Sequence, residues 1–407
     1  MKYVNRPTYE QQLKRLKDSE DIKVLTGVRR CGKSSLLQWL SNDLMENGVQ
    51  ESNIFYKRMD MFGMPVNPNA DWLLNELTQA IEKANAAKPF YVLLDEIQDV
   101  KNWERVIRQL HTRPNTDVYL TGSNAYILSS DIATLIGGRY IEVKIQPLSF
   151  KEYLNFAKSN KINFDSNEAA FAKYLKYGGM PALFNLKSNG QEEIAQFLKT
   201  VYETVIINDV ATRTRIDDFD LLAKLVRYVF STSGNLFSAN KIANTLTSYG
   251  RKTRVETVIA YLKALKDALI LSECEQEGLA GKEILRPRCK YYPVDTGLRN
   301  LMCGFKAENV GFQLENVVYN ELLHRGWHIG VGVLKNSEVD FVATRADDKL
   351  YVQVTETMLG DSVRARELAP LQELDNSWTK LVLTLDNAGC GKTENGIEVK
   401  NICNWLL

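Results

Sequence analysis

Apolar and polar residues follow two alternating periods along the first 150 residues. Short, mostly apolar runs typical of buried strands lie at 21–26, 53–60, 89–96, 117–124 and 140–145. Between them, apolar residues recur at helical spacing over 36–44, 72–87, 103–111 and 127–136. Strands that alternate with helices predict an α/β fold with a parallel sheet and helices on both faces.

The pattern changes at Pro147. The segment from 151 to about 217 is predicted to be helical, and 238–268 predicts two short helices joined by a glycine turn, before a strand that starts at Ile270. This order resembles a winged helix-turn-helix. From Gly311 a helix at 312–325 and strands at 327–333, 337–344, 350–357 and 380–385 predict a smaller α/β unit. We therefore expect four parts: 1–150, a helical linker at 151–217, a winged helix at 218–305, and 306–407.

The turn after the first strand contains the sequence Gly27-Val-Arg-Arg-Cys-Gly-Lys-Ser34. Gly27 and Gly32 allow successive backbone N–H groups to point into one concavity, and the following helix directs its positive dipole end to the same point. Lys33 then reaches the β- and γ-phosphates of a nucleotide, and Ser34 ligates Mg²⁺. The turn predicts an ATP-binding phosphate loop, with ATP and Mg²⁺ as the ligands.

The run 89–96 ends in Asp95 and Glu96, which supply the second half of a phosphoryl-transfer site. Asp95 holds Mg²⁺, directly or through water, and Glu96 polarises a water molecule toward the γ-phosphate. Alone, two acids after a strand are equally typical of a solvated turn. The phosphate loop favours the catalytic interpretation.

Three further polar residues are candidates for the same site. Ser123 and Asn124 end the next strand, where they contact the γ-phosphate or the attacking water, or only cap the local turn. Arg139 is a candidate catalytic cation, although an exposed arginine is the commoner outcome. The predicted nucleotide contacts are Gly27, Val28, Arg29, Arg30, Cys31, Gly32, Lys33, Ser34, Ser35, Asp95, Ser123 and Asn124.

A second glycine-containing segment, 386–393, also ends in Gly-Lys-Thr. Asp386 stands at the position of the first glycine, where its carboxylate repels phosphate, and no apolar helix follows Thr393. We predict a hairpin loop and not a second nucleotide site.

Composition excludes several classes of protein. The number of Lys and Arg residues (51) nearly equals the number of Asp and Glu residues (50). The net charge therefore favours binding neither to nucleic acid nor to an anionic membrane. The six cysteines form no Cys-x2-Cys pair, which argues against a zinc site or a disulfide scaffold. No signal peptide and no apolar run of membrane-spanning length is present, and we expect a cytoplasmic protein.

These motifs together resemble prokaryotic AAA-type ATP-binding proteins fused to a winged helix and to a C-terminal domain of unknown function (DUF4143) with a restriction-endonuclease-like fold. The segments that carry the resemblance are 27–34, 93–98, 120–124, 138–140, 147–150, 178–181, 292–297 and 338–342. The resemblance implies an ATPase core, and it assigns water activation to Glu96 and magnesium binding to Asp95.

The C-terminal part departs from an active nuclease of that fold. Glu315 and Asp340 match the helix and strand acids, but Gln353 and Thr355 stand where the next strand carries a metal-binding acid and a lysine. An amide binds Mg²⁺ less well than a carboxylate, so we predict an inactive terminal domain. An active nuclease would need a substitute cation near Asp340, and Lys335 is the nearest in sequence.

The favoured hypothesis is an ATPase that couples its nucleotide state to DNA or to a protein partner. Lys241, Arg251, Lys252 and Arg254 make the expected winged helix locally basic, as DNA contact requires, although such clusters are more often a solvated face. The alternatives are an ATP-dependent nuclease and a nucleotide-sensing scaffold without efficient turnover. The sequence leaves open whether the chain forms a homo-oligomer in which Arg139 acts on a neighbour.

Overall fold

The computed structural model describes residues 3–122, 136–186, 190–211, 216, 218–278, 288–306, 310–334 and 337–407. The chain folds into two compact units. The first comprises 1–146 with 267–269, and the second comprises 147–266 with 270–407. The finer four-part division stays a prediction.

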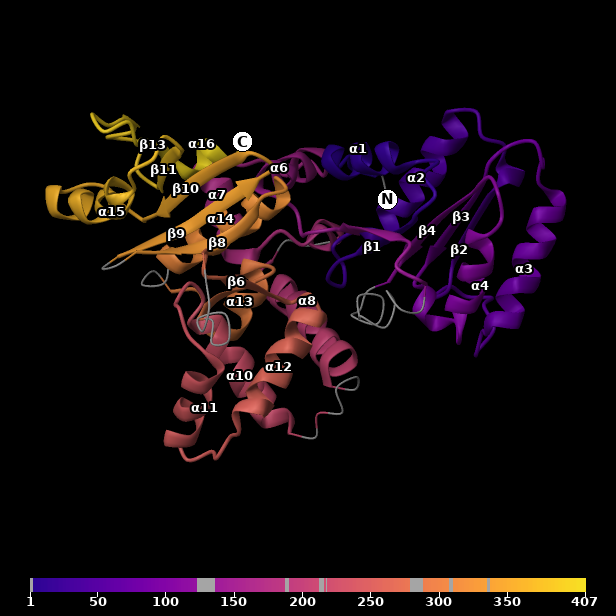
Figure 1. Cartoon of the computed structure of the whole chain (residues 1–407), viewed down its shortest axis with the longest axis horizontal. Coiled ribbons are helices and arrows are strands. Elements are labelled where there is room, and N and C mark those ends of the chain that lie inside the picture. The colour runs from indigo at the N-terminus through magenta and orange to yellow at the C-terminus, as the bar shows by residue number, and fades with distance from the viewer. Residues whose placement is uncertain are drawn as a thin grey trace. The chain divides into compact units, whose positions relative to one another are not determined.

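The first unit is built on a five-stranded sheet in the order β2-β3-β4-β1-β5 (Figure 1). Its strands are β1 (Ile22–Thr26), β2 (Ile54–Arg58), β3 (Phe90–Asp95), β4 (Thr116–Thr121) and β5 (Tyr140–Lys144). Every neighbouring pair is parallel. The predicted parallel α/β core is confirmed, and the carboxyl ends of β1, β3 and β4 share one edge of the sheet.

Helices cover both faces of this sheet. They are α1 (Pro7–Leu16), α2 (Lys33–Glu46), α3 (Ala70–Lys83) and α4 (Trp103–His111), with short 3-10 turns at Glu51–Asn53 and Ile97–Asp99. Apolar residues of α3 and α4 pack with Val24, Val92 and Leu120 in one buried cluster. Helix α2 also packs on the central strands, and α1 packs on α2 (Figure 1). The predicted helix at 127–136 lies almost entirely outside the described residues.

The second unit begins with helices. They are α6 (Phe150–Ser159), α7 (Asn167–Tyr177), a 3-10 turn at Pro181–Asn185, α8 (Gln191–Thr204) and a π-helical turn at Val205–Ala211. Next come α10 (Phe219–Ser231), α11 (Ala239–Ser248), α12 (Val255–Asp267), the antiparallel strands β6 (Leu271–Glu275) and β7 (Cys289–Pro293), and α13 (Thr296–Cys303). Three helices followed by a two-stranded ribbon is the arrangement that the winged-helix prediction requires; the assignment itself stays a prediction.

A six-stranded mixed sheet in the order β12-β13-β11-β10-β9-β8 forms the rest of this unit. The elements are α14 (Val310–His324), β8 (His328–Val333), β9 (Glu338–Arg345), β10 (Asp348–Val354), α15 (Asp361–Glu373), β11 (Thr379–Thr384), β12 (Gly391–Lys392), β13 (Glu398–Asn401) and α16 (Ile402–Leu406). Helices α14 and α16 share a core with one face of the sheet, and α15 packs on the other. The four predicted strands are present, whereas α15, β13 and α16 were not predicted.

The second glycine-containing segment contains no phosphate loop. Gly391 and Lys392 form β12, which pairs antiparallel with β13 as one arm of a hairpin, and no helix begins directly after Thr393. The Asp386 carboxylate accepts the N–H of Met358 at 2.6 Å. The hairpin prediction is confirmed.

The segments 178–181 and 292–297, two of the glycine- and proline-containing motifs in the second unit, bind each other. The Asp295 carboxylate accepts the N–H of Gly179 at 2.7 Å and that of Leu298, in the first turn of α13, at 3.1 Å. A Cβ atom on Gly178, whose φ is +80°, would lie 2.1 Å from Asp295 Oδ1. Only a residue without a side chain allows this approach.

Asp295 makes the stability of the chain depend on pH. Burial raises its pKa from 3.8 to about 6, although backbone N–H groups lower it. The folded state therefore binds this proton more tightly than the unfolded state, and the free energy of unfolding falls as pH rises from about 4 through 6, by at most about 3 kcal/mol. The free energy of unfolding can be measured by urea unfolding at pH values on both sides of 6. Asp295→Asn is expected to reduce its dependence on pH. Asp348→Asn, at an exposed position, is the control and is expected to show the same pH dependence as the unaltered protein.

Candidate functional site

The phosphate loop connects the end of β1 to the first turn of α2. Gly27 has a φ of +150°, and a Cβ atom there would lie 2.3 Å from the Ile145 carbonyl oxygen and 2.6 Å from Cys31 Sγ. Gly32 caps α2 in the left-handed conformation, and no side chain caps the helix. The first N–H groups of α2 have no partner within the helix and carry its positive dipole end, which suits an anion.

Lys33 and Ser34 begin α2 and point to different partners. Lys33 Nζ is buried and donates to the carbonyl oxygens of Gly27 at 2.9 Å and Val28 at 3.3 Å, so the ammonium folds back over the loop. Ser34 Oγ donates to Asp95 Oδ1 at 3.1 Å. The loop and the end of β3 therefore meet, as the sequence predicts.

The remaining loop residues differ in exposure. Val28 and Cys31 are buried, Arg29 is half-buried, and Arg30 and Ser35 are exposed. Arg30 adopts a φ of +68°, which is unusual for a residue with a side chain.

Asp95 is fully buried at the carboxyl end of β3. Its Oδ1 accepts the hydroxyls of Thr121 and Ser34, whereas Oδ2 has no hydrogen-bond partner and lies 3.3 Å from Arg58 Nε. Burial raises the pKa of Asp95, and the two hydroxyl hydrogen bonds oppose that shift. A buried carboxylate oxygen without a hydrogen bond, beside the Ser34 hydroxyl, fits a Mg²⁺ ion that takes most other ligands from phosphate and water.

Glu96 is held beside Asp95 in a left-handed conformation, with a φ of +55°. Its N–H donates to Thr121 Oγ1 at 3.1 Å, and its carboxylate accepts a hydrogen bond from Gln98 Nε2. Thr121 of β4 thus binds both acids of the site. Strain at a non-glycine residue requires support from its surroundings, which Thr121 and Gln98 provide.

Two of the predicted contacts, Ser123 and Asn124, lie outside the described residues. Arg139 is described, and it lies at the opposite edge of the sheet from the loop. Its carbonyl accepts the N–H of Ile22, and Tyr140 pairs with Ile22, so Arg139 precedes the amino ends of β5 and β1. A five-residue strand spans roughly 17 Å, and the structure does not bring Arg139 to the phosphate loop of its own chain. Its catalytic role stays a prediction that requires a neighbouring copy.

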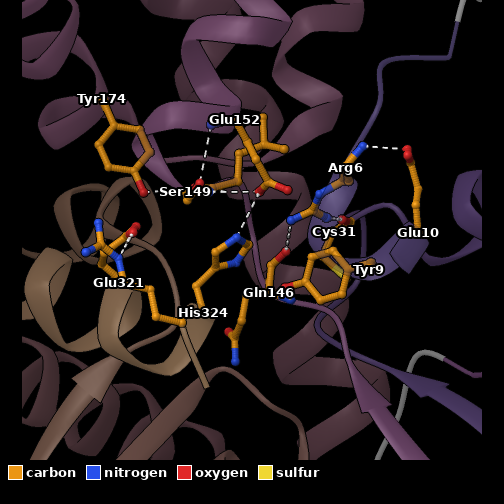
Figure 2. A network of polar contacts seen from close by, with 12 residues as sticks. Arg6, Tyr9, Glu10, Cys31, Gln146, Ser149, Glu152, Tyr174, Glu321 and His324 are labelled. Atoms are coloured by element: carbon orange, nitrogen blue, oxygen red, sulfur yellow. Dashed lines mark hydrogen bonds and ion pairs between the residues drawn. The ribbon is translucent and has the colours of Figure 1, made fainter. Parts of the chain in front are cut away.

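Arg6 is a residue of this site that the sequence analysis missed (Figure 2). Its buried guanidinium donates to the Cys31 carbonyl at 3.0 Å and to the Gln146 carbonyl at 2.9 Å, and it lies 4.6 Å from the centre of the Tyr9 ring. The Tyr9 hydroxyl accepts the N–H of Gln146 at 3.0 Å. Arg6 therefore fastens the phosphate loop to the segment that leaves β5. An arginine before the first helix has no local pattern that would have marked it.

Arg6→Ala is expected to loosen the phosphate loop. Loss of the charged hydrogen bond to Cys31 corresponds to about 1.5–3 kcal/mol, or about a tenfold to hundredfold lower ATP affinity, if the loop binds nucleotide. The independent measurement is alkylation of the Cys31 thiol, which is buried in the structure and is expected to react faster in the variant. Arg15→Ala, at an exposed position of α1, is the control. Equal Cys31 alkylation in all three proteins would contradict the fastening role.

Comparison with known proteins agrees with this geometry. Residues 19–154 match the AAA domain family, and 168–309 match a domain of unknown function, DUF8612. A solved Walker-type ATPase of Pyrococcus abyssi shares the fold, with a TM-score of 0.52 and 16% identity over 74% of this chain and 96% of that one. The fold and the loop of the first unit are those of an AAA domain with a phosphate loop.

Two uncharacterised proteins are similar over nearly their whole length. The relative in Haemophilus influenzae is 36% identical over 99% of this chain and 98% of its own, and one in Methanocaldococcus jannaschii is 30% identical over 95% and 88%. The chain belongs to the family of these uncharacterised bacterial and archaeal proteins, with an AAA domain at residues 19–154. Among the described residues, no helix is long and apolar enough to cross a membrane.

Proposed function

We propose that the first unit binds ATP with Mg²⁺ and hydrolyses it. The observation that carries this proposal is the convergence of the Lys33 loop, the Ser34–Asp95 contact and Glu96 at one edge of the sheet. Lys33 contacts the phosphates, Ser34 and Asp95 hold the metal, and Glu96 orients the attacking water. Bound Mg²⁺ supplies charge neutralisation on the phosphate oxygens.

The test is ATP turnover by the full chain with and without Mg²⁺. We expect release of inorganic phosphate that depends on the metal. A chain that binds ATP but releases no phosphate would be the nucleotide-sensing scaffold instead. Native mass with bound nucleotide, measured in parallel, reports whether copies assemble as a role for Arg139 requires.

We further propose that the nucleotide state is coupled to DNA through the helices α11 and α12. Lys241 of α11 is exposed, as are Lys252 and Arg254 in the segment between the two helices, whereas the guanidinium of Arg251 is paired with Asp218 and Asp220. Three exposed cations predict a slope of about −3 when the logarithm of the DNA association constant is plotted against the logarithm of salt concentration. DNA that stimulates turnover would support this coupling. Unchanged turnover and salt-insensitive association with a protein would favour a protein partner.

A further inference from the structure

One lysine of the second unit lies at the centre of three carboxylates. Lys290 of β7 is 1% exposed. Its Nζ lies 2.6 Å from Glu338 Oε1, 3.1 Å from Asp340 Oδ1 and 3.3 Å from Glu315 Oε2. Glu315 comes from α14, and the other two acids come from β9. An ammonium group has three N–H donors, and each meets a different carboxylate here.

Other groups of the chain bind the same carboxylates. Asp340 Oδ2 accepts the N–H of Val354 at 2.9 Å, and Glu315 Oε2 accepts the Tyr292 hydroxyl at 3.1 Å. The Gln353 amide accepts the N–H of Asp340 and donates to Glu367, both at 3.3 Å. The cluster is satisfied by protein groups alone.

A divalent metal does not fit this arrangement. The restriction-endonuclease resemblance implies a Mg²⁺ ion between Glu315 and Asp340. Mg²⁺ requires near-octahedral oxygen ligands at about 2.0–2.1 Å and keeps several waters. Here the ammonium of Lys290 lies between those two side chains, and its positive charge repels a second cation.

The charges of the cluster agree with an internal cation. Burial lowers the pKa of Lys290, but the three surrounding carboxylates raise it further, so its net direction is above the ordinary value and the side chain is charged. Burial, and then the charge of Asp340, raise the pKa of Glu315, whereas the charge of Lys290 and the hydrogen bonds from Tyr292 and Lys290 lower it. A raised pKa of Glu315 means that this side chain carries less negative charge than an exposed glutamate, which reduces the excess of negative charge in the cluster.

We propose that Lys290 is a built-in cation that replaces a divalent metal at the Glu315, Glu338 and Asp340 cluster. The cluster fastens β7 to α14 and β9 and performs no metal-dependent cleavage. Removal of the Lys290 ammonium opens the three carboxylates to a divalent ion. This inference does not depend on ATP binding.

The test measures Mn²⁺ binding by the nucleotide-free full chain, with thermal unfolding in parallel. The unaltered protein and Asp340→Asn are expected to bind Mn²⁺ equally. Lys290→Ala is expected to bind one more Mn²⁺ ion than the unaltered protein, with an affinity at least about tenfold higher than that of any Mn²⁺ bound at this cluster in the unaltered protein. Its midpoint of thermal unfolding is expected to rise with Mn²⁺ concentration. Adding Asp340→Asn to Lys290→Ala is expected to abolish that site. Lys290→Arg keeps the charge and is expected to behave as the unaltered protein.

Three results would overturn the proposal. One is Mn²⁺ binding by the unaltered protein that Asp340→Asn removes. Another is DNA cleavage by the unaltered protein that Asp340→Ala abolishes. The third is a folded Lys290→Ala chain that binds no additional Mn²⁺. The first two measurements use the unaltered fold, so they decide the question even if Lys290→Ala does not fold.

Discussion

Lys33→Ala is expected to abolish ATP binding at concentrations where the unaltered chain is saturated. In the structure this ammonium lies on the carbonyls of Gly27 and Val28, inside the loop. Charged hydrogen bonds to two phosphates correspond to about 3–6 kcal/mol together, or about a hundredfold to ten-thousandfold in affinity. Titration calorimetry with ATP and Mg²⁺ measures the loss.

The chain contains a matched control for this substitution. Lys392 also follows a glycine and precedes a hydroxyl residue, but it lies in the exposed hairpin of β12 and β13. Lys392→Ala is expected to leave ATP affinity unchanged. Near-normal affinity in Lys33→Ala, or an equal loss in both variants, would refute the role assigned to the loop.

Glu96→Gln is expected to keep ATP bound and to slow its hydrolysis. The amide preserves the size of the side chain and still pairs with Gln98, but it no longer accepts a proton from water. Loss of a general base costs about a hundredfold to ten-thousandfold in turnover. Phosphate release measures the rate, and calorimetry is expected to give a dissociation constant within a few-fold of the unaltered value.

Glu82→Gln is the control, because Glu82 is an exposed residue of α3. It is expected to alter neither rate nor affinity. Turnover that is unchanged in Glu96→Gln would show that Glu96 is not the base, without affecting the assignment of Lys33. A loss of both binding and turnover would show instead that Glu96 supports the loop.

The sequence predicted the first unit well because the residues that define its site lie in short contiguous segments. The phosphate loop lies within one contiguous segment, and the acids follow directly on a buried strand. Parallel strands bring such segments to a common edge, so the contact between Ser34 and Asp95 follows from strand direction. The same rule could have placed Arg139: it precedes a strand, and therefore lies at the other edge.

The residues that the sequence missed act across long separations along the chain. Thr121 and Arg58 reach Asp95 from neighbouring strands, and Arg6 reaches residues 31 and 146. For the terminal cluster, proximity along the chain pointed to Lys335, which lies outside the described residues. The ammonium beside Asp340 belongs to Lys290, 50 positions earlier. No periodicity or spacing in the sequence marks such a residue.

The position of Lys290 also determines whether the C-terminal residues can be transferred to another protein as an independent domain. A fragment that starts at residue 306 would lack the ammonium, and with it Leu148, Phe150 and Phe171, whose side chains complete the same apolar core. Such a piece would retain three uncompensated acids and an open hydrophobic surface. The last hundred residues are therefore not a portable module, and gene fusion or exchange that transfers them must also carry the helical segments encoded upstream.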